Sequence, residues 1–193
     1  MRLLKLLLVM LVCAAMPAAA GPLEDATAAY LKGDYATALR LWRPLAEQGD
    51  ASAQTRLGNS YYDGQGVSQD YAAALTWYRK AADQGYAIAQ HNLGAMYEGG
   101  RGVSQDYVAA LTWYRKAADQ GSAQDQNNLG RMYAYGKGVP QDYVQAYKWF
   151  NLAASRAQEG DEWAAQRRNE VAAKMTPAQI AEAQKLAREW KPK

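Results

Sequence analysis

The sequence predicts an all-α protein, folded as a solenoid of antiparallel helix pairs. One motif recurs at a fixed step of 36 residues, and its three copies begin at Leu57, Leu93 and Leu129. Every copy carries two stretches with the apolar spacing of a helix, separated by a Gly-x-Gly turn. A period between about 20 and 50 residues is typical of a repeat array, in which each unit buries its apolar face against its neighbours.

Each unit is predicted to form two helices. The first helix of the first full unit carries Leu57, Gly58 and Tyr61 on one face. The second helix carries an apolar stripe at positions i, i+3, i+4, i+7 and i+8, namely Ala74, Trp77, Tyr78, Ala81 and Ala82. Glycine just past a helix end favours the left-handed conformation, so we expect Gly64 to end the first helix. Asp70 stands where the N-cap of the second helix is expected.

Aromatic and acidic residues recur with the same period, and we interpret both sets as structural. The aromatic set is predicted to be core and consists of Trp77, Trp113, Trp149, Tyr61, Tyr97 and Tyr133. The acidic set consists of Asp70, Asp106 and Asp142. No second carboxylate is repeated beside these aspartates, so we interpret them as helix caps rather than as catalytic acids.

The full motif, L-G-x-x-Y-x-x-G-x-G-V-x-x-D-Y-x-x-A-x-x-W-(Y/F)-x-x-A-A, resembles the Sel-1-like repeat, a relative of the tetratricopeptide repeat. The resemblance covers roughly residues 34–158, and three copies match at every motif position. It implies a right-handed superhelix of antiparallel helix pairs, with the first helix of each pair lining a concave face. It also implies a role as an interaction scaffold, without specifying the partner.

The chain is expected to divide into six segments. They are a signal peptide at 1–20, a degenerate N-terminal helical repeat at 21–50, full repeats at 51–86, 87–122 and 123–160, and C-terminal capping helices at 161–193. The degenerate repeat lacks the glycine loop, which suits a terminal unit with one face unstacked. Pro44 is expected to kink or shorten its second helix.

The capping helices have their own start signals. Asp161 can cap a first helix, and Thr176 followed by Pro177 and Gln179 is a strong start signal for a second one. Four apolar residues fall on one face of that second helix and are expected to cover the open end of the solenoid: Ile180, Ala183, Ala187 and Trp190.

The first twenty residues have the order of a secretory signal peptide. Arg2 and Lys5 precede an apolar stretch that is too short to span a bilayer, and three alanines stand before Gly21. We therefore expect the protein to be exported, either to the periplasm or into the medium. A lipoprotein signal with Cys13 acylated and an uncleaved anchor are the rival interpretations; bulky Val12 disfavours the former.

Cleavage would change the charge balance and remove the single cysteine. The segment holds two of the 22 basic residues and none of the 19 acidic ones, so the net charge falls from +3 to +1. A net charge of +1 is too small for the strong positive potential that binding of duplex nucleic acid requires. Without Cys13 there is no disulfide, and no later segment is apolar enough to span a membrane.

The inventory of reactive residues predicts no catalytic site, no metal site and no cofactor. His91 is the single histidine, and no serine is followed by x-x-Lys. The sequences S-D-N and K-T-G are also absent. Some cysteine-rich secreted relatives of this repeat family have been described as penicillin-binding or β-lactamase-like, and this chain has neither their cysteines nor those motifs.

Candidate binding residues are assigned by the resemblance, which places them on the inner face of each first helix. These positions vary from unit to unit, unlike the core, and a varied polar and aromatic strip suits a protein or peptide segment. The candidates are Thr55, Asn59, Tyr62, Asp63, His91, Glu98, Asn127, Arg131 and Tyr135. Among them, Tyr62 and Arg131 are the preferred first targets, because Tyr and Arg are frequent interface hot spots.

The sequence therefore favours a non-enzymatic, exported scaffold that binds a protein or peptide segment in the cell envelope. One alternative is a module that binds an envelope polysaccharide through Tyr62, Tyr135 and exposed tryptophan rings. A less favoured alternative is a β-lactamase-like or cell-wall hydrolase, which would need a motif serine or a dense acid–base cluster.

The N-terminal segment gives a direct prediction. The exported protein is expected to begin at Gly21, because the small residues before it fit signal peptidase cleavage. N-terminal sequencing or intact-mass spectrometry of the exported protein checks this. Retention of Met1, or a lipid on Cys13, would contradict it.

Overall fold

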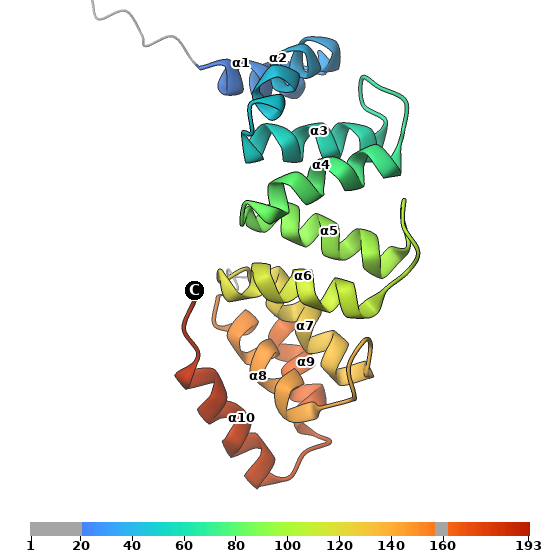
Figure 1. Cartoon of the computed structure of the whole chain (residues 1–193). Coiled ribbons are helices and arrows are strands. Elements are labelled where there is room, and N and C mark those ends of the chain that lie inside the picture. The colour runs from blue at the N-terminus through green and yellow to red at the C-terminus, as the bar shows by residue number, and fades with distance from the viewer. Residues whose placement is uncertain (1–20, 157–161) are drawn as a thin grey trace, which may run out of the picture.

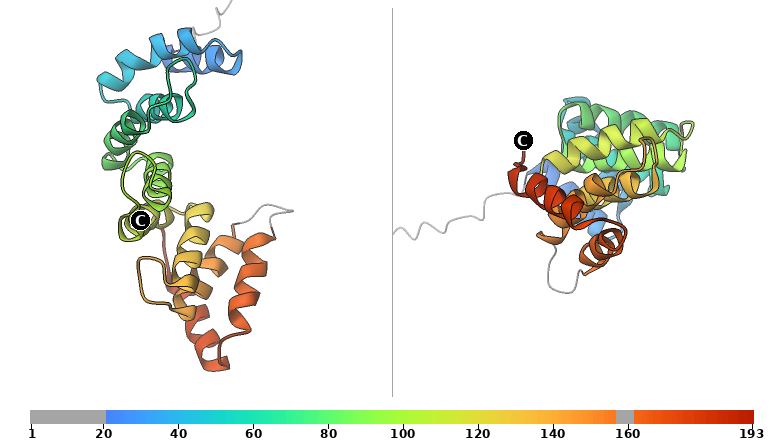
Figure 2. Two further views of the ribbon diagram at one scale, coloured as in Figure 1. Left: turned by 90° about the vertical axis from the view of Figure 1, so that its right-hand side faces the viewer. Right: turned by 90° about the horizontal axis from the view of Figure 1, so that it is seen from below.

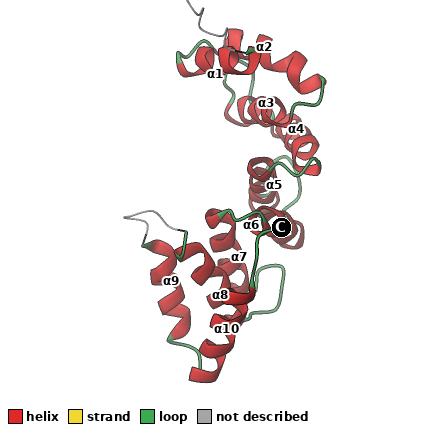
Figure 3. Cartoon of the chain, turned by 90° about the vertical axis from the view of Figure 1, so that its left-hand side faces the viewer, coloured by secondary structure: helices red, strands yellow, loops and turns green. Residues whose placement is uncertain are grey.

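The computed structural model describes residues 21–156 and 162–193, and this part of the chain forms ten α-helices and no strand (Figures 1 and 3). The helices are α1 (Pro22–Leu31), α2 (Tyr35–Glu47), α3 (Ala51–Asp63), α4 (Tyr71–Asp83), α5 (Ala87–Gly99), α6 (Tyr107–Asp119), α7 (Ala123–Tyr135), α8 (Tyr143–Ala154), α9 (Trp163–Ala172) and α10 (Pro177–Glu189). The predicted all-α solenoid is confirmed.

The helices stack in chain order. Helices α1 and α2, α3 and α4, α5 and α6, and α7 and α8 pack as pairs, and each pair packs on the next (Figure 2). Both α9 and α10 pack against α8. The apolar face of α10 meets the last two core clusters through the four predicted residues, Ile180, Ala183, Ala187 and Trp190. The C-terminal helices therefore cover the last repeat.

Within each full unit, a glycine of the first helix lies directly against an aromatic ring of the second. A Cβ added to Gly58 would stand 2.5 Å from the Tyr78 ring, and one added to Gly94 would stand 2.7 Å from Tyr114. At Gly130 the equivalent distance to Phe150 is 2.6 Å. No real Cβ atom fits at such distances, so glycine is required for the two helices to approach this closely.

Between units, a buried glutamine of each first helix caps the preceding helix. The Nε2 atoms of Gln54, Gln90 and Gln126 donate to the carbonyls of Ala46, Ala82 and Ala118. All three glutamines are at most 4% exposed. Each of these carbonyls also accepts a backbone N–H, from Gly49, Gly85 and Gly121, so the glutamine adds a second hydrogen bond at the end of the helix. The same hydrogen bond thus joins one unit to the next three times.

The predicted turn chemistry is present. Gly64 has φ +71° and ends α3, and the Asp70 carboxylate accepts from the backbone N–H of Ala73. The corresponding aspartates cap α6 and α8. Thr176 and Gln179 form a capping box at the start of α10. Asp161 lies outside the described residues.

Two expectations about single residues differ from the structure. Helix α2 continues through Pro44 to Glu47, so the proline does not shorten it. Trp77 is only half-buried, whereas Trp113 and Trp149 are buried. The reason is that Trp77 packs against the cluster of the shortened first unit, whereas Trp113 packs against that of a full unit.

The tyrosines also differ from expectation. Tyr61, Tyr97 and Tyr133 were expected in the core, but they are half-buried, and two of them accept hydrogen bonds from arginines, Tyr97 from Arg79 and Tyr133 from Arg115. Each ring packs against a core cluster, while the residue as a whole stays partly exposed.

The packing of the central unit gives a stability prediction. Trp113→Ala is expected to cost about 3–5 kcal/mol, because Trp113 is 9% exposed and fills the junction between units. Tyr62→Ala is expected to cost about 1 kcal/mol, since Tyr62 is half-buried and its ring contacts Tyr71 edge-on, at 5.2 Å between ring centroids, and the Arg101 guanidinium. Denaturant unfolding of both variants checks the difference. Equal losses would mean that the burial is assigned wrongly.

Candidate functional site

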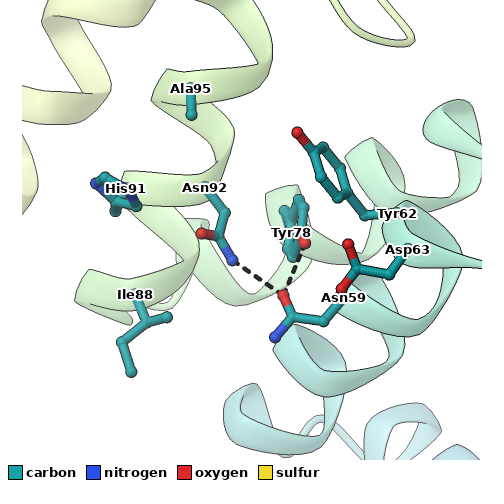
Figure 4. A pocket seen from close by; sticks show the side chains of 8 residues that line it. All are labelled: Asn59, Tyr62, Asp63, Tyr78, Ile88, His91, Asn92 and Ala95. Carbon is teal, nitrogen blue, oxygen red and sulfur yellow. Dashed lines mark hydrogen bonds between the residues drawn. The ribbon is translucent and has the colours of Figure 1, made fainter. Parts of the chain in front are cut away.

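The first helices of neighbouring units enclose a cavity of about 380 Å³ between α3 and α5 (Figure 4). Helix α3 supplies one wall and α5 the other, while one residue of α4 closes the floor. The lining residues are Asn59, Tyr62, Asp63, Tyr78, Ile88, His91, Asn92 and Ala95. Four of these belong to the set predicted from the sequence, so the structure brings Asn59, Tyr62, Asp63 and His91 together.

The floor of the cavity is held by hydrogen bonds. The Tyr78 hydroxyl donates to Asn59 Oδ1 at 2.7 Å, and Asn92 Nδ2 donates to the same oxygen at 3.1 Å. Burial raises the pKa of Tyr78, and the negative charge of Asp63 raises it further. The phenol therefore stays protonated at neutral pH and keeps its role as a donor.

The rim carries one carboxylate and one aromatic ring. Asp63 is exposed and forms no ion pair with any residue in 21–156 or 162–193. Tyr62 is half-buried, because its ring packs edge-on against Tyr71 and beneath the guanidinium of Arg101, at 5.3 Å. The rim is therefore fixed in position, while the Asp63 charge is left to solvent.

At the next junction, between α5 and α7, an ion pair joins the two first helices. Arg131 Nη2 donates to Glu98 Oε1 at 2.7 Å, and Lys137 Nζ lies 3.9 Å from the same oxygen. The Tyr114 hydroxyl donates to Glu98 Oε2 at 2.9 Å. Burial raises the pKa of Tyr114, and the Glu98 carboxylate adds to the effect. The predicted site residues Glu98 and Arg131 are thus brought together, and their charges are paired within the protein.

His91 belongs to a second cluster across the same junction. Its Nδ1 lies 2.7 Å from Oδ1 of Asp125, which is 1% exposed, and Ser122 donates to the other carboxylate oxygen at 2.5 Å. His91 Nε2 faces the side-chain amide of Gln124 at 3.3 Å. In a catalytic triad the serine would contact the imidazole. Here serine and histidine both bind the aspartate, so the arrangement links helices instead of activating a nucleophile.

The other predicted residues lie elsewhere. Thr55 is a correction: it is 3% exposed, and its hydroxyl donates to the Ala51 carbonyl of its own helix, so it offers nothing to a partner. Asn127 accepts a hydrogen bond from Arg167 of α9, at 3.3 Å. Tyr135, at the end of α7, is 68% exposed.

Sequence reasoning missed Ile88, Asn92 and Asp125. Ile88 and Asn92 precede Ala95 by seven and three residues, so a helical face drawn through His91 would have included them. Ile88 is also an exposed apolar residue whose counterparts are Ser52 and Gln124. This variation between units was the available signal.

Four stretches of the chain match the Sel1 repeat family, at residues 27–50, 51–86, 87–122 and 123–157. The protein belongs to the Sel1 repeat family. It is a helical-repeat scaffold, a class that commonly mediates protein interactions. No curated protein sequence matches the chain.

Two solved structures share the fold. One is a protective antigen with an SLR fold from uropathogenic Escherichia coli strains, which is 36% identical with a TM-score of 0.78 over 88% of this chain and 37% of that one. The other is a Sel1 repeat protein from Oxalobacter formigenes, 30% identical with a TM-score of 0.68 over 86% of this chain and 74% of that one. The Sel1 chain described here thus spans little more than a third of the antigen.

Two features are absent from the part of the chain that the structure describes. In residues 21–156 and 162–193, no helix is both long and apolar enough to cross a bilayer. The same part of this Sel1 repeat protein contains no group of three or more His, Cys, Asp or Glu residues that could hold a metal ion.

The buried aspartate gives a prediction. His91→Ala is expected to cost about 1–3 kcal/mol, because the Asp125 carboxylate loses the partner of one oxygen in a buried position. Adding Asp125→Ala should recover part of that loss, as expected for two residues that interact directly. Denaturant unfolding of the two single variants and the double variant checks this. Additive losses would show that the contact does not join the units.

Proposed function

We propose that this Sel1 repeat protein is a non-catalytic, exported scaffold that binds an extended segment of a partner protein along α3, α5 and α7. The cavity between α3 and α5 supplies a recess with a fixed polar floor, and Ile88 at its side is 55% exposed. A recess beside an exposed apolar residue suits a peptide with alternating side chains.

The observation that carries the proposal is the contrast between the two faces of each first helix. The buried face is the same in every unit, with leucine at 57, 93 and 129 and glycine directly after it. The open face differs, with Asn59, Ala95 and Arg131 at one position and Tyr62, Glu98 and Ala134 at another. These variable residues lie on one surface, and the packing of one unit on the next does not require them. Such a surface favours recognition of one particular partner.

The contacts of Tyr62 disfavour its use in the polysaccharide alternative, which leaves Tyr135, 68% exposed, as the open tyrosine ring of the two named for it. A sugar-binding platform needs an open aromatic face, but the Tyr62 ring is already packed against Tyr71 and Arg101. The hydrolase alternative needs a serine in contact with a histidine. In the one cluster of serine, aspartate and histidine among the described residues, Ser122 and His91 each bind Asp125 instead of each other.

Export is part of the proposal and rests on the order of residues 1–20, which lie outside the described structure. Charged, apolar and small residues follow one another there as in a secretory signal. The partner is therefore expected in the cell envelope or the medium.

Two exposed apolar residues allow a matched test of the binding face. Ile88 lies on the first helix α5 and is 55% exposed, whereas Val108 lies on the second helix α6 and is 60% exposed. Ile88→Glu is expected to abolish recovery of the partner when the tagged protein is cross-linked in an envelope fraction, because a charge would enter the apolar contact. Val108→Glu should recover the same partner at the level of the unchanged protein.

The comparison is informative only if both variants keep the helical circular dichroism spectrum and the melting temperature. The reverse result, with the partner lost in Val108→Glu and kept in Ile88→Glu, would move the binding surface to the second helices. Equal recovery in both folded variants would reject the proposed face.

A further inference from the structure

The two junctions between full units can be compared position by position, because the units repeat every 36 residues. Ala95 on α5 is the counterpart of Arg131 on α7, and Asn92 is the counterpart of Asn128. At the α5–α7 junction, the Arg131 guanidinium donates to Glu98 and, at 3.3 Å, to Asn128 Oδ1. At the α3–α5 junction, Ala95 lines the 380 Å³ cavity with a methyl group alone, where Arg131 carries a guanidinium at the next junction.

The acceptors that hold Arg131 have counterparts around this cavity. Asp63, one residue beyond the position equivalent to Glu98, lines it with a carboxylate that has no ion-pair partner in the described residues. Asn92 uses its Nδ2 to bind Asn59, so its Oδ1 is left as an acceptor, as Asn128 Oδ1 is for Arg131. The cavity therefore contains a carboxylate and a side-chain amide oxygen, the two kinds of acceptor that bind Arg131 at the next junction, but no arginine.

The charges around the cavity point the same way. Asp63 is its one acidic residue, and its field reaches the floor, where it helps to raise the pKa of Tyr78. His91 is bound to the Asp125 carboxylate, which balances any positive charge on the ring. Arg101 lies over the Tyr62 ring and forms no ion pair with Asp63. An anionic side chain would thus meet a carboxylate, whereas a cationic one finds an unneutralised charge.

We propose that the cavity between α3 and α5 binds the side chain of an arginine on the partner's extended segment. The proposal rests on the proposed function and names the residue that the segment presents. Arginine fits better than lysine, because its planar guanidinium carries several N–H donors in a fork that matches a carboxylate such as that of Asp63, whereas an ammonium group is a point charge. An apolar residue next to the arginine would lie on Ile88.

A titration followed by NMR tests the site with defined probes. The ¹⁵N-labelled exported protein is titrated with the capped tripeptide acetyl-alanyl-arginyl-leucine amide, and separately with the same peptide carrying citrulline, which has the shape of arginine without its charge. We expect the arginine peptide to shift the amide signals of Asn59, Asp63 and Ala95 with a Kd on the order of 1 mM. The citrulline peptide should bind about tenfold more weakly.

Two substitutions locate the site, each with a matched control. Asp63→Asn should reduce binding of the arginine peptide about tenfold, whereas Asp83→Asn, an equal charge change at the exposed end of α4, should leave binding unchanged. Ala95→Arg should abolish binding, because the protein would then fill the cavity as Arg131 fills the next junction. Ala72→Arg adds the same charge at an exposed position of α4 and should keep binding.

The outcomes separate this inference from the proposed function. Equal binding of the two peptides, unchanged binding in folded Asp63→Asn, or absence of shifts at Asn59, Asp63 and Ala95 up to about 10 mM peptide would each overturn the arginine site. If Ile88→Glu still loses the cross-linked partner in that case, the first-helix face stands and only the arginine is wrong. Loss of the partner in folded Ala95→Arg, but not in Ala72→Arg, would extend the arginine site to the natural partner.

Discussion

The contact on which the structure depends is the one between a glycine and an aromatic ring in each full unit. Gly58 lies against Tyr78, Gly94 against Tyr114, and Gly130 against Phe150, at distances that no other residue permits. This contact sets the separation of the two helices of a pair, and the rings continue into the core clusters that join one pair to the next. Because the rings are held, their hydroxyls stand at fixed places: that of Tyr78 binds Asn59, and that of Tyr114 binds Glu98.

The repeating parts of the fold could be predicted from the sequence because each follows from a local rule. Gly64 had to end a helix, and Asp70 had to begin one, in every copy. Burial was predicted less well, since it depends on what each unit packs against. Trp77 meets a shortened neighbour and stays half-exposed, and Thr55 turns its hydroxyl back to its own helix. The hydrogen bond between His91 and Asp125 joins residues 34 positions apart, and no local sequence pattern predicts it.

The candidate site arises where the repeats differ within a constant frame. The same helix arrangement has an ion pair between Glu98 and Arg131 at the α5–α7 junction and an open cavity at the α3–α5 junction. The difference follows from single substitutions between units, above all alanine at 95 against arginine at 131. The glycine contact and the buried glutamine bonds do not involve the open face, so substitutions there leave both kinds of contact in place. The proposed recognition surface and these constant contacts thus lie on different faces of the same helices.

The measurement that tests this account most directly compares two glycines of α5. Gly94→Ala would place a Cβ 2.7 Å from the buried Tyr114 ring, whereas the nearest atom to a Cβ at Gly99 is 3.6 Å away. Denaturant unfolding should show a loss of about 1–3 kcal/mol for Gly94→Ala and none for Gly99→Ala. A Gly94→Ala protein as stable as Gly99→Ala would show that the close approach of glycine and ring does not hold the helix pair together, and would contradict the account.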